Sequence, residues 1–387
     1  MEPRVVDEVV KIVKRYHPAF LTEHEYNGKL PYLALSEAEY DSFVEDYKKT
    51  LPAVSTKAEN YALVAKLLVP LGDAHTNVFW NAGLPLLKEI EGKICLVGVG
   101  SEVPKEQREN YFFSEVISID GIPIAKLISK AKKLIPTETN ERRSFAAVRN
   151  FSSLLFLQAL GVAKDDKIKF LLENNKKYEL PKSVLKVGEP RLVVPKILSK
   201  PLYYDLKMID KILVITYTKC YGKSEAFWKD FRNELDSYLK KVSSVIVDLR
   251  GNSGGNASGF IDKIVPKIKH KTGCVLIDNG VFSAGCWTAL ALKKCGYSFV
   301  GETMAQPLAR CGDNNSCSVM NGEVEFGVST IYWDLYKEFD LPKSTTSKPD
   351  VWVSPKIDAL KSGQDLMLEK AIEICKEAES ELRRDKK

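Results

Sequence analysis

The sequence is poor in the features that mark several common classes of protein. It holds only 4 histidines in 387 residues, and its 8 cysteines form no Cys-x-x-Cys pair. A zinc site and a disulfide-built scaffold are therefore disfavoured. No apolar run approaches the roughly 20 residues that a membrane span needs, and the first residues lack the basic-then-apolar order of a signal peptide. We expect no membrane span and a cytoplasmic protein, or an extracytoplasmic one if a signal peptide has been removed.

The charge and the loop motifs exclude further classes. A net charge of +6 is small for this length and does not indicate a nucleic-acid partner. The glycine-rich stretch 251–256 lacks the Lys and Ser/Thr of a P-loop, and it does not fit G-x-G-x-x-G. We expect neither a cofactor nor a metal. With 44% apolar residues, the chain can build two or three domains with real cores.

The pattern along the chain predicts four regions. Residues 1–80 are predicted to be helical, with helix caps at Ser36 and at Ser55 or Thr56, and to end in a strand at 76–80. Residues 81–200 mix short strands with helices and include a hairpin about Asn174-Asn175. In 201–375, buried strands alternate with helices, one of them expected at 259–268, which predicts βαβ units and a mostly parallel sheet. Residues 376–387 form a charged tail. Functional loops lie at the carboxyl ends of such strands, which here are the loops 250–257 and 278–285.

Both loops contain residues suited to acyl-transfer chemistry. Ser283 follows an apolar strand and precedes a helix, so it is either a nucleophile at a helix N-terminus or an N-cap. The G-x-S-x-G motif is absent, because Val281 stands at its first glycine. Gly254 and Gly255 could present backbone N–H groups to an anion, or form a plain turn.

A serine nucleophile needs a base, and His75 is the best-placed histidine. It follows a Gly-Asp turn and leads into an apolar stretch, whereas His270 lies among lysines and His24 among charged residues. The alternative is a structural histidine at a turn.

Taken together, these motifs resemble the C-terminal-processing and tricorn-type serine peptidases. The signatures are Asp73-Ala-His75-Thr76, Asp248-Leu-Arg-Gly-Asn-Ser-Gly-Gly255, Phe282-Ser-Ala-Gly285 and Lys348-Pro-Asp-Val-Trp-Val353. The Ser-Lys branch of the family carries a Lys in the stretch that corresponds to 304–309, which here has none. The resemblance therefore points to the Ser-His branch, with an interphotoreceptor-retinoid-binding-protein-like catalytic domain.

The resemblance implies a fold. It indicates an α/β protein with a crotonase-like (ClpP/crotonase-type) core of sheet and helices in 201–375. The helical N-terminal region would carry the His motif, and the small β-rich module in 81–200 is loosely similar to the PDZ-type insert of the family.

The resemblance also implies roles for single residues. Ser283 would be the nucleophile and His75 its base, with the N–H groups of Ala284 and of Gly254 or Gly255 forming the oxyanion hole. The third member of the site stays open, because no Glu stands at the place that aligns with the acid of the family. The sequence offers three acidic alternatives, which are Glu302, Glu338 and Asp340.

The expected function is that of a serine peptidase. It would hydrolyse peptides or unfolded polypeptides through an acyl-enzyme, and whether it forms a homo-oligomer is left open. One alternative is a catalytically inactive peptide-binding or scaffold homologue of the same fold. A crotonase-type acyl-CoA enzyme is a weaker alternative, because it does not account for the Asp-x-His-Thr motif.

Overall fold

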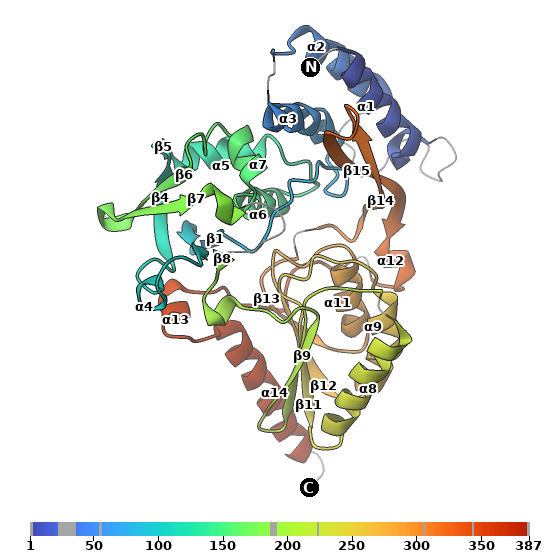
Figure 1. The fold of residues 1–387 in the computed structure, drawn as a ribbon. Coiled ribbons are helices and arrows are strands. Elements are labelled where there is room, and N and C mark those ends of the chain that lie inside the picture. Colours follow the sequence, from blue (N-terminus) through green and yellow to red (C-terminus); the bar gives the residue numbers. More distant parts are fainter. Residues whose placement is uncertain are drawn as a thin grey trace. The chain divides into compact units, whose positions relative to one another are not determined.

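The computed structural model describes residues 3–21, 36–53, 56–185, 192–222, 224–304, 306–342 and 344–384 (Figure 1). The chain forms two compact units. The first comprises Met1–Pro195 and Ala309–Trp333, and the second Lys196–Leu308 and Asp334–Lys387. The last three residues of the expected charged tail lie outside the described residues, and the rest of it continues the C-terminal helix.

Three helices open the first unit, namely α1 (Pro3–Tyr16), α2 (Glu37–Lys49) and α3 (Lys57–Leu68). Capping boxes start two of them, with Ser36 and Glu39 at α2 and Thr56 and Glu59 at α3, so the backbone N–H groups of each first turn are satisfied. Most of α3 is buried, which makes it the central helix of this region.

An antiparallel sheet follows, in the order β1-β2-β4-β6-β7, and β5 pairs with β4. Its strands are β1 (Leu87–Ile90), β2 (Lys93–Leu96), β4 (Ser114–Ile119), β5 (Ile122–Pro123), β6 (Lys167–Leu172) and β7 (Lys177–Pro181). The β6–β7 hairpin turns at Asn174 and Asn175, both with φ of 59°, as the sequence predicted. The accompanying elements are α4 (Lys105–Arg108), α5 (Ile124–Lys132), α6 (Asn140–Asn150), α7 (Leu154–Ala159) and the pair β3 (Val99–Gly100) and β8 (Leu192–Val193).

A long hairpin, β14 (Ala309–Val319) and β15 (Val324–Asp334), packs with this first unit although it falls within the range 201–375. It pairs with the segment after His75, where the Phe79 N–H donates to the Glu325 carbonyl at 3.0 Å and the Gly327 N–H to the Asn77 carbonyl at 2.8 Å. The strand expected at 76–80 exists only as the bridge of Val78 to Phe326. The hairpin thus holds the turn that carries His75.

A second sheet, in the order β16-β13-β12-β11-β10-β9, forms the centre of the second unit. All pairings from β10 to β16 are parallel, and β9 is an antiparallel edge strand. The predicted α/β alternation and mostly parallel sheet are confirmed. The strands are β9 (Tyr204–Ile209), β10 (Ile212–Tyr217), β11 (Ser244–Asp248), β12 (Thr272–Ile277), β13 (Ser298–Gly301) and β16 (Val351–Trp352).

Helices cover both faces of this sheet (Figure 1). On one face, α14 (Leu366–Arg384) packs Met367 and Ala371 against the apolar side chains of the central strands. On the other face, the ring of Phe231 from α8 (Glu225–Leu239) stacks on Tyr204 at 3.9 Å. Burial on both faces explains why β11 consists entirely of buried residues.

The remaining helices of the second unit are short, apart from α11 (Ala284–Lys294). The helix expected at 259–268 is divided, because Pro266 cannot donate a hydrogen bond within a helix. The other helices are α9 (Ser258–Lys263), α10 (Val265–Ile268), α12 (Leu335–Glu338) and α13 (Ile357–Lys361). The 3-10 turns of the chain are Pro18–Phe20, Val69–Leu71, Glu173–Asn175, Lys182–Leu185 and Lys196–Leu198. Among the described residues, no helix is long and apolar enough to span a membrane.

Candidate active site

In the second unit, Asn252 joins the loops that follow three neighbouring strands. Its side-chain amide donates to the Tyr217 carbonyl at the end of β10 at 2.9 Å. Its own carbonyl accepts the Phe282 N–H of the Ser283 loop at 3.0 Å, and its Oδ1 accepts the Gly254 N–H at 3.0 Å. Asn252 is completely buried, so each bond replaces one that water would otherwise make. The side chain of Asn252 thus fixes the glycine loop to the end of β10, and its backbone carbonyl fixes the same loop to the serine loop.

The two glycines of this loop occupy backbone conformations that other residues rarely adopt. Gly254 has φ of +101°, and a Cβ there would lie 2.6 Å from Ser283 Cβ. Gly255 has φ of +129°, and a Cβ there would lie 1.7 Å from the Cys220 carbonyl oxygen. Both positions therefore require glycine, and Gly254 brings its backbone directly against the serine.

Ser283 occupies the N-cap position of α11 but does not cap the helix. Its φ of 51° and ψ of −125° differ from the extended conformation of an ordinary N-cap, and its side chain makes no capping hydrogen bond. Its own N–H donates to Gln306 Oε1 at 2.7 Å. A half-buried serine held in a sparsely populated conformation at a helix N-terminus is a common feature of functional sites.

Gln306 was not identified from the sequence. It lies in the stretch 304–309, which was noted only for its lack of a lysine, and nothing in its neighbourhood in the sequence marks it. Gln306 is 1% exposed, and its bond to the Ser283 N–H helps to hold the serine in its strained conformation.

A group of paired charges surrounds Arg250, the first residue of the loop 250–257. Arg250 makes paired hydrogen bonds to Asp248 and to Asp365, with closest distances of 2.7 Å to each, and Lys200 contacts Asp248 at 2.6 Å. Burial raises the pKa of Asp248, but the charges of Arg250 and Lys200 outweigh this and hold it well below its usual range. The Arg250 guanidinium is therefore paired with a carboxylate on each of two sides.

Asp278 ties the loops 250–257 and 278–285 together. Its Oδ1 accepts the Gly251 N–H at 2.8 Å and the Gly280 N–H at 2.9 Å, one from each loop. The loops after β11 and β12 are therefore fixed by side chains that the sequence motifs contain.

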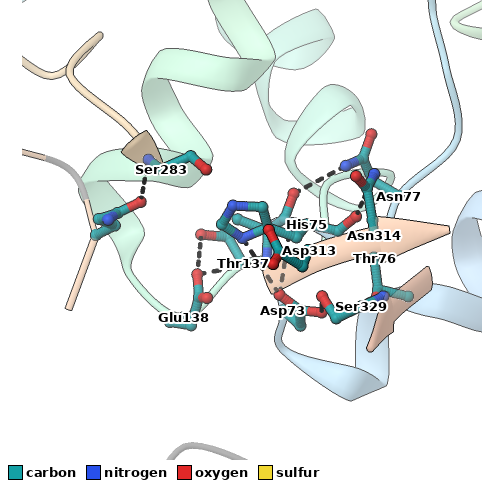
Figure 2. Close-up of polar contacts among 12 residues, drawn as sticks. Asp73, His75, Thr76, Asn77, Thr137, Glu138, Ser283, Asp313, Asn314 and Ser329 are labelled. Atoms are coloured by element: carbon teal, nitrogen blue, oxygen red, sulfur yellow. Dashed lines mark hydrogen bonds and ion pairs between the residues drawn. The ribbon is translucent and has the colours of Figure 1, made fainter. Parts of the chain in front are cut away.

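In the first unit, His75 lies in a tight turn organised by Asp73. Asp73 Oδ1 accepts the His75 backbone N–H at 2.9 Å. Asp73 Oδ2 accepts the hydroxyls of Thr76 at 2.5 Å and Ser329 at 2.6 Å (Figure 2). The same oxygen lies 3.3 Å from His17 Nε2. The Asp-x-His-Thr motif therefore acts first as a local structural unit, to which β15 adds Ser329.

Burial dominates the electrostatics of this turn. It lowers the pKa of His75 to about 3, with Arg310 and Arg142 acting in the same direction and Asp73 opposing them. Burial raises the pKa of Asp73, but the contact with His17 and the hydroxyl of Ser329 outweigh it and keep that pKa low. At neutral pH, His75 is therefore a neutral imidazole, which is the form that accepts a proton.

Glu138 is the second acidic residue beside His75, and no sequence motif marks it. Three atoms lie within 4.8 Å of one another, namely one carboxyl oxygen of Glu138, one of Asp73 and one ring nitrogen of His75 (Figure 2). Burial and the charge of Asp73 raise the pKa of Glu138 to about 7, while Arg310 opposes the rise.

The three acidic residues proposed from the sequence lie in the second unit. Glu302 follows β13, and its N–H donates to the Ile277 carbonyl at 2.9 Å. Glu338 ends α12 and Asp340 follows it, and both are exposed. None of the three belongs to the unit that holds His75.

The side chains around Asp73 do not indicate a metal centre. His17, Asp73 and Cys311 lie within 4.8 Å of one another. Hydroxyl groups already occupy Asp73 Oδ2, and burial raises the pKa of the Cys311 thiol, which disfavours the thiolate that binds metals.

Comparison with known proteins identifies the fold. No protein-family model matches the sequence, and no curated protein does. Among solved structures, mature CPAF in complex with lactacystin aligns over 97% of this chain and 98% of its own, with a TM-score of 0.62 and 11% identity. A second structure of mature CPAF covers 96% of both chains with a TM-score of 0.59 and 11% identity. The photosystem II D1 C-terminal processing protease aligns over 94% of this chain and 98% of its own, with a TM-score of 0.46 and 14% identity. At identities this low the likeness concerns the fold alone, and the two CPAF structures, with TM-scores of 0.62 and 0.59, show that this chain shares their fold.

Proposed function

We propose that this protein is a serine peptidase that cleaves peptides or unfolded polypeptides through an acyl-enzyme on Ser283. The observation that carries the proposal is the conformation of Ser283, strained and not used as a helix cap, with a glycine loop packed against it. Such strain is maintained where the surrounding structure fixes a reactive group. The CPAF-like fold supports the same conclusion.

The proposed chemistry takes two steps. Ser283 Oγ attacks the carbonyl carbon of the substrate, and His75 takes the Oγ proton and then donates it to the leaving amine. A water molecule, deprotonated by His75, next attacks the acyl-enzyme and releases Ser283 with its proton restored. The low pKa of His75 keeps the ring neutral before the first step.

Two backbone N–H groups would stabilise the oxyanion, those of Ala284 and Gly255. Ala284 begins α11, where N–H groups have no partner within the helix. Of the two loop glycines, Gly254 donates its N–H to Asn252, while the Gly255 N–H donates to no group in the described part of the chain. The Gly255 N–H is therefore the better candidate for the oxyanion hole. Gly254 allows the loop backbone to approach Ser283 closely.

The proposal combines residues of both units. His75 comes from the first unit and Ser283 from the second, so neither unit would be active by itself. A crotonase-like core in the second unit and a PDZ-like module in the first belong to the same proposal. Glu302, Glu338 and Asp340 remain alternatives for an acid that orients the histidine.

Labelling with a fluorophosphonate probe tests the proposal. The wild-type protein should be labelled, with the adduct on Ser283 by mass spectrometry. Ser283→Ala should abolish labelling with a nearly unchanged melting temperature, and His75→Ala should slow labelling by about 1,000-fold or more. Ser237→Ala, which alters an exposed serine of α8, serves as the matched control. A folded wild-type protein that is never labelled would favour the inactive peptide-binding alternative.

A peptide-library digest extends this test to the substrate. Wild-type protein should release new peptide termini that are absent from the Ser283→Ala digest. Identical digests would contradict hydrolysis.

A further inference from the structure

We propose that Glu138 is a positioning residue for His75, whose carboxylate stabilises the positive charge that the ring acquires when it takes the Ser283 proton. This inference rests on the proposed function and deepens it, because it assigns the acidic member that the motifs left open.

A carboxyl oxygen of Glu138 lies within 4.8 Å of a ring nitrogen of His75. Glu138 Oε2 accepts the Ala74 N–H at 3.4 Å and the Thr137 hydroxyl at 3.5 Å, so it is bound to the residue that directly precedes the histidine. Its Oε1 is fully buried and has no hydrogen-bond partner among the described residues, although the residue as a whole is only half-buried. A buried carboxyl oxygen without a partner is costly, which indicates that it serves a group that changes during the reaction.

Asp73 is less suited to this role, although it is nearer in sequence. Its two oxygens already accept the His75 backbone N–H and the hydroxyls of Thr76 and Ser329, in addition to the contact with His17. His75 Nδ1 lies 3.9 Å from Asp73 Oδ1, which is longer than a hydrogen bond. Asp73 therefore maintains the turn, and Glu138 has the oxygen left to respond to the ring.

Charged and titratable groups surround Glu138 on several sides. Asp73 and His75 face it from the turn, Arg142 from α6, and Arg310 and Cys311 from β14; His17 acts on it through Asp73. Because burial and Asp73 raise its pKa to about 7, Glu138 changes from neutral to charged near neutral pH. His75 does not titrate in that range, since its own pKa is lowered to about 3. The charge beside His75 should therefore appear as the pH rises through about 7, and the reaction should accelerate with it.

The pH dependence of Ser283 labelling by the fluorophosphonate probe tests this role. In the wild type, the labelling rate should rise around pH 7. Glu138→Gln should remove this rise and lower the rate at pH 8 by about tenfold or more. Glu138→Asp should restore part of both effects, which a merely structural role would not. Glu141→Gln, the same change at an exposed position of α6, should match the wild type.

A Glu138→Gln profile that keeps the wild-type rise would overturn the inference, because another group would then be titrating. If the wild type is not labelled at any pH, the proposed function fails, and thermal stability decides the placement of Glu138 independently. A raised pKa means that the folded state retains a proton that the unfolded state releases between about 4.5 and 7. The wild type should then lose stability relative to Glu138→Gln as the pH rises through that window, and parallel curves would overturn the inference.

Discussion

The surroundings of Ser283 and those of His75 differ in what fixes them. Around Ser283, the backbone is held by Asn252, Asp278 and Gln306, and the nearby charges are paired in a closed group. Around His75, several titratable groups are buried close together, and burial shifts the pKa values of His75 and Glu138 toward their neutral forms. The arrangement around Ser283 therefore depends on how closely the backbone is packed. The arrangement around His75 depends on which side chains are protonated. Substitutions that add atoms should damage the first most, and those that change charge should damage the second most.

Among substitutions other than those of Ser283 and His75, the largest effect should come from Gly255→Ala. The new Cβ would overlap the Cys220 carbonyl, and moving the loop would displace an oxyanion donor. We expect the labelling rate to fall by about 100-fold or more, because one such donor contributes about 3 kcal/mol. Gly254→Ala should act similarly through its contact with Ser283. The control is Gly222→Ala, where the nearest atom lies 3.8 Å away. Normal labelling of both loop variants would mean that shape does not govern the serine region.

An intermediate effect on stability should follow Asp365→Asn. This substitution removes one of the two carboxylates that pair with Arg250. Because the Asp365 side chain is 21% exposed and Asp248 remains, we expect a loss of about 1–2 kcal/mol in the free energy of unfolding at pH 7.

The stability loss caused by Asp365→Asn should depend on pH, in the opposite direction to the effect expected in the histidine region. Burial raises the pKa of Asp365, but the bonds and charge of Arg250 outweigh this and lower it. The stabilisation is therefore present at neutral pH and is lost as the pH falls through the lowered pKa. Urea melts of wild type and variant should converge in acid, which is the opposite direction to that expected for Glu138. The control is Asp262→Asn on the exposed side of α9, and a difference that persists in acid would contradict the pairing.

The smallest effect should come from Ser329→Ala. The substitution removes one of the two hydroxyls that donate to Asp73 Oδ2. The Thr76 hydroxyl and the contact with His17 remain. We expect a loss of about 1 kcal/mol in stability and less than a tenfold change in labelling rate. Thermal melts and labelling check both numbers, with Ser318→Ala at an exposed position of β14 as control. A far larger loss of labelling at unchanged stability would show that Asp73 itself acts on His75.

Much of the fold was predictable because its signals are local. The capping residues Ser36 and Thr56, the Asn174-Asn175 turn and the alternation of buried strands with helices each depend on neighbours in sequence. The serine and glycine loops were also found, since both follow strands of the parallel sheet. The hairpin β14–β15 was assigned to the range 201–375, because no pattern within it reveals that its partners are residues 76–80.

Local sequence patterns predicted most of the elements, the loops at the ends of the strands and the motifs that contain Ser283 and His75. Which groups surround those two residues became known from the folded chain. Gln306 reaches Ser283 and Glu138 reaches the turn of His75 through folding, and neither lies in a motif. The physical reason is that conformational preferences act over a few residues, whereas burial and charge act between all groups that packing brings close. His75 was singled out among only four histidines, but its pKa depends on burial and on Arg310 and Arg142, which its own motif does not supply.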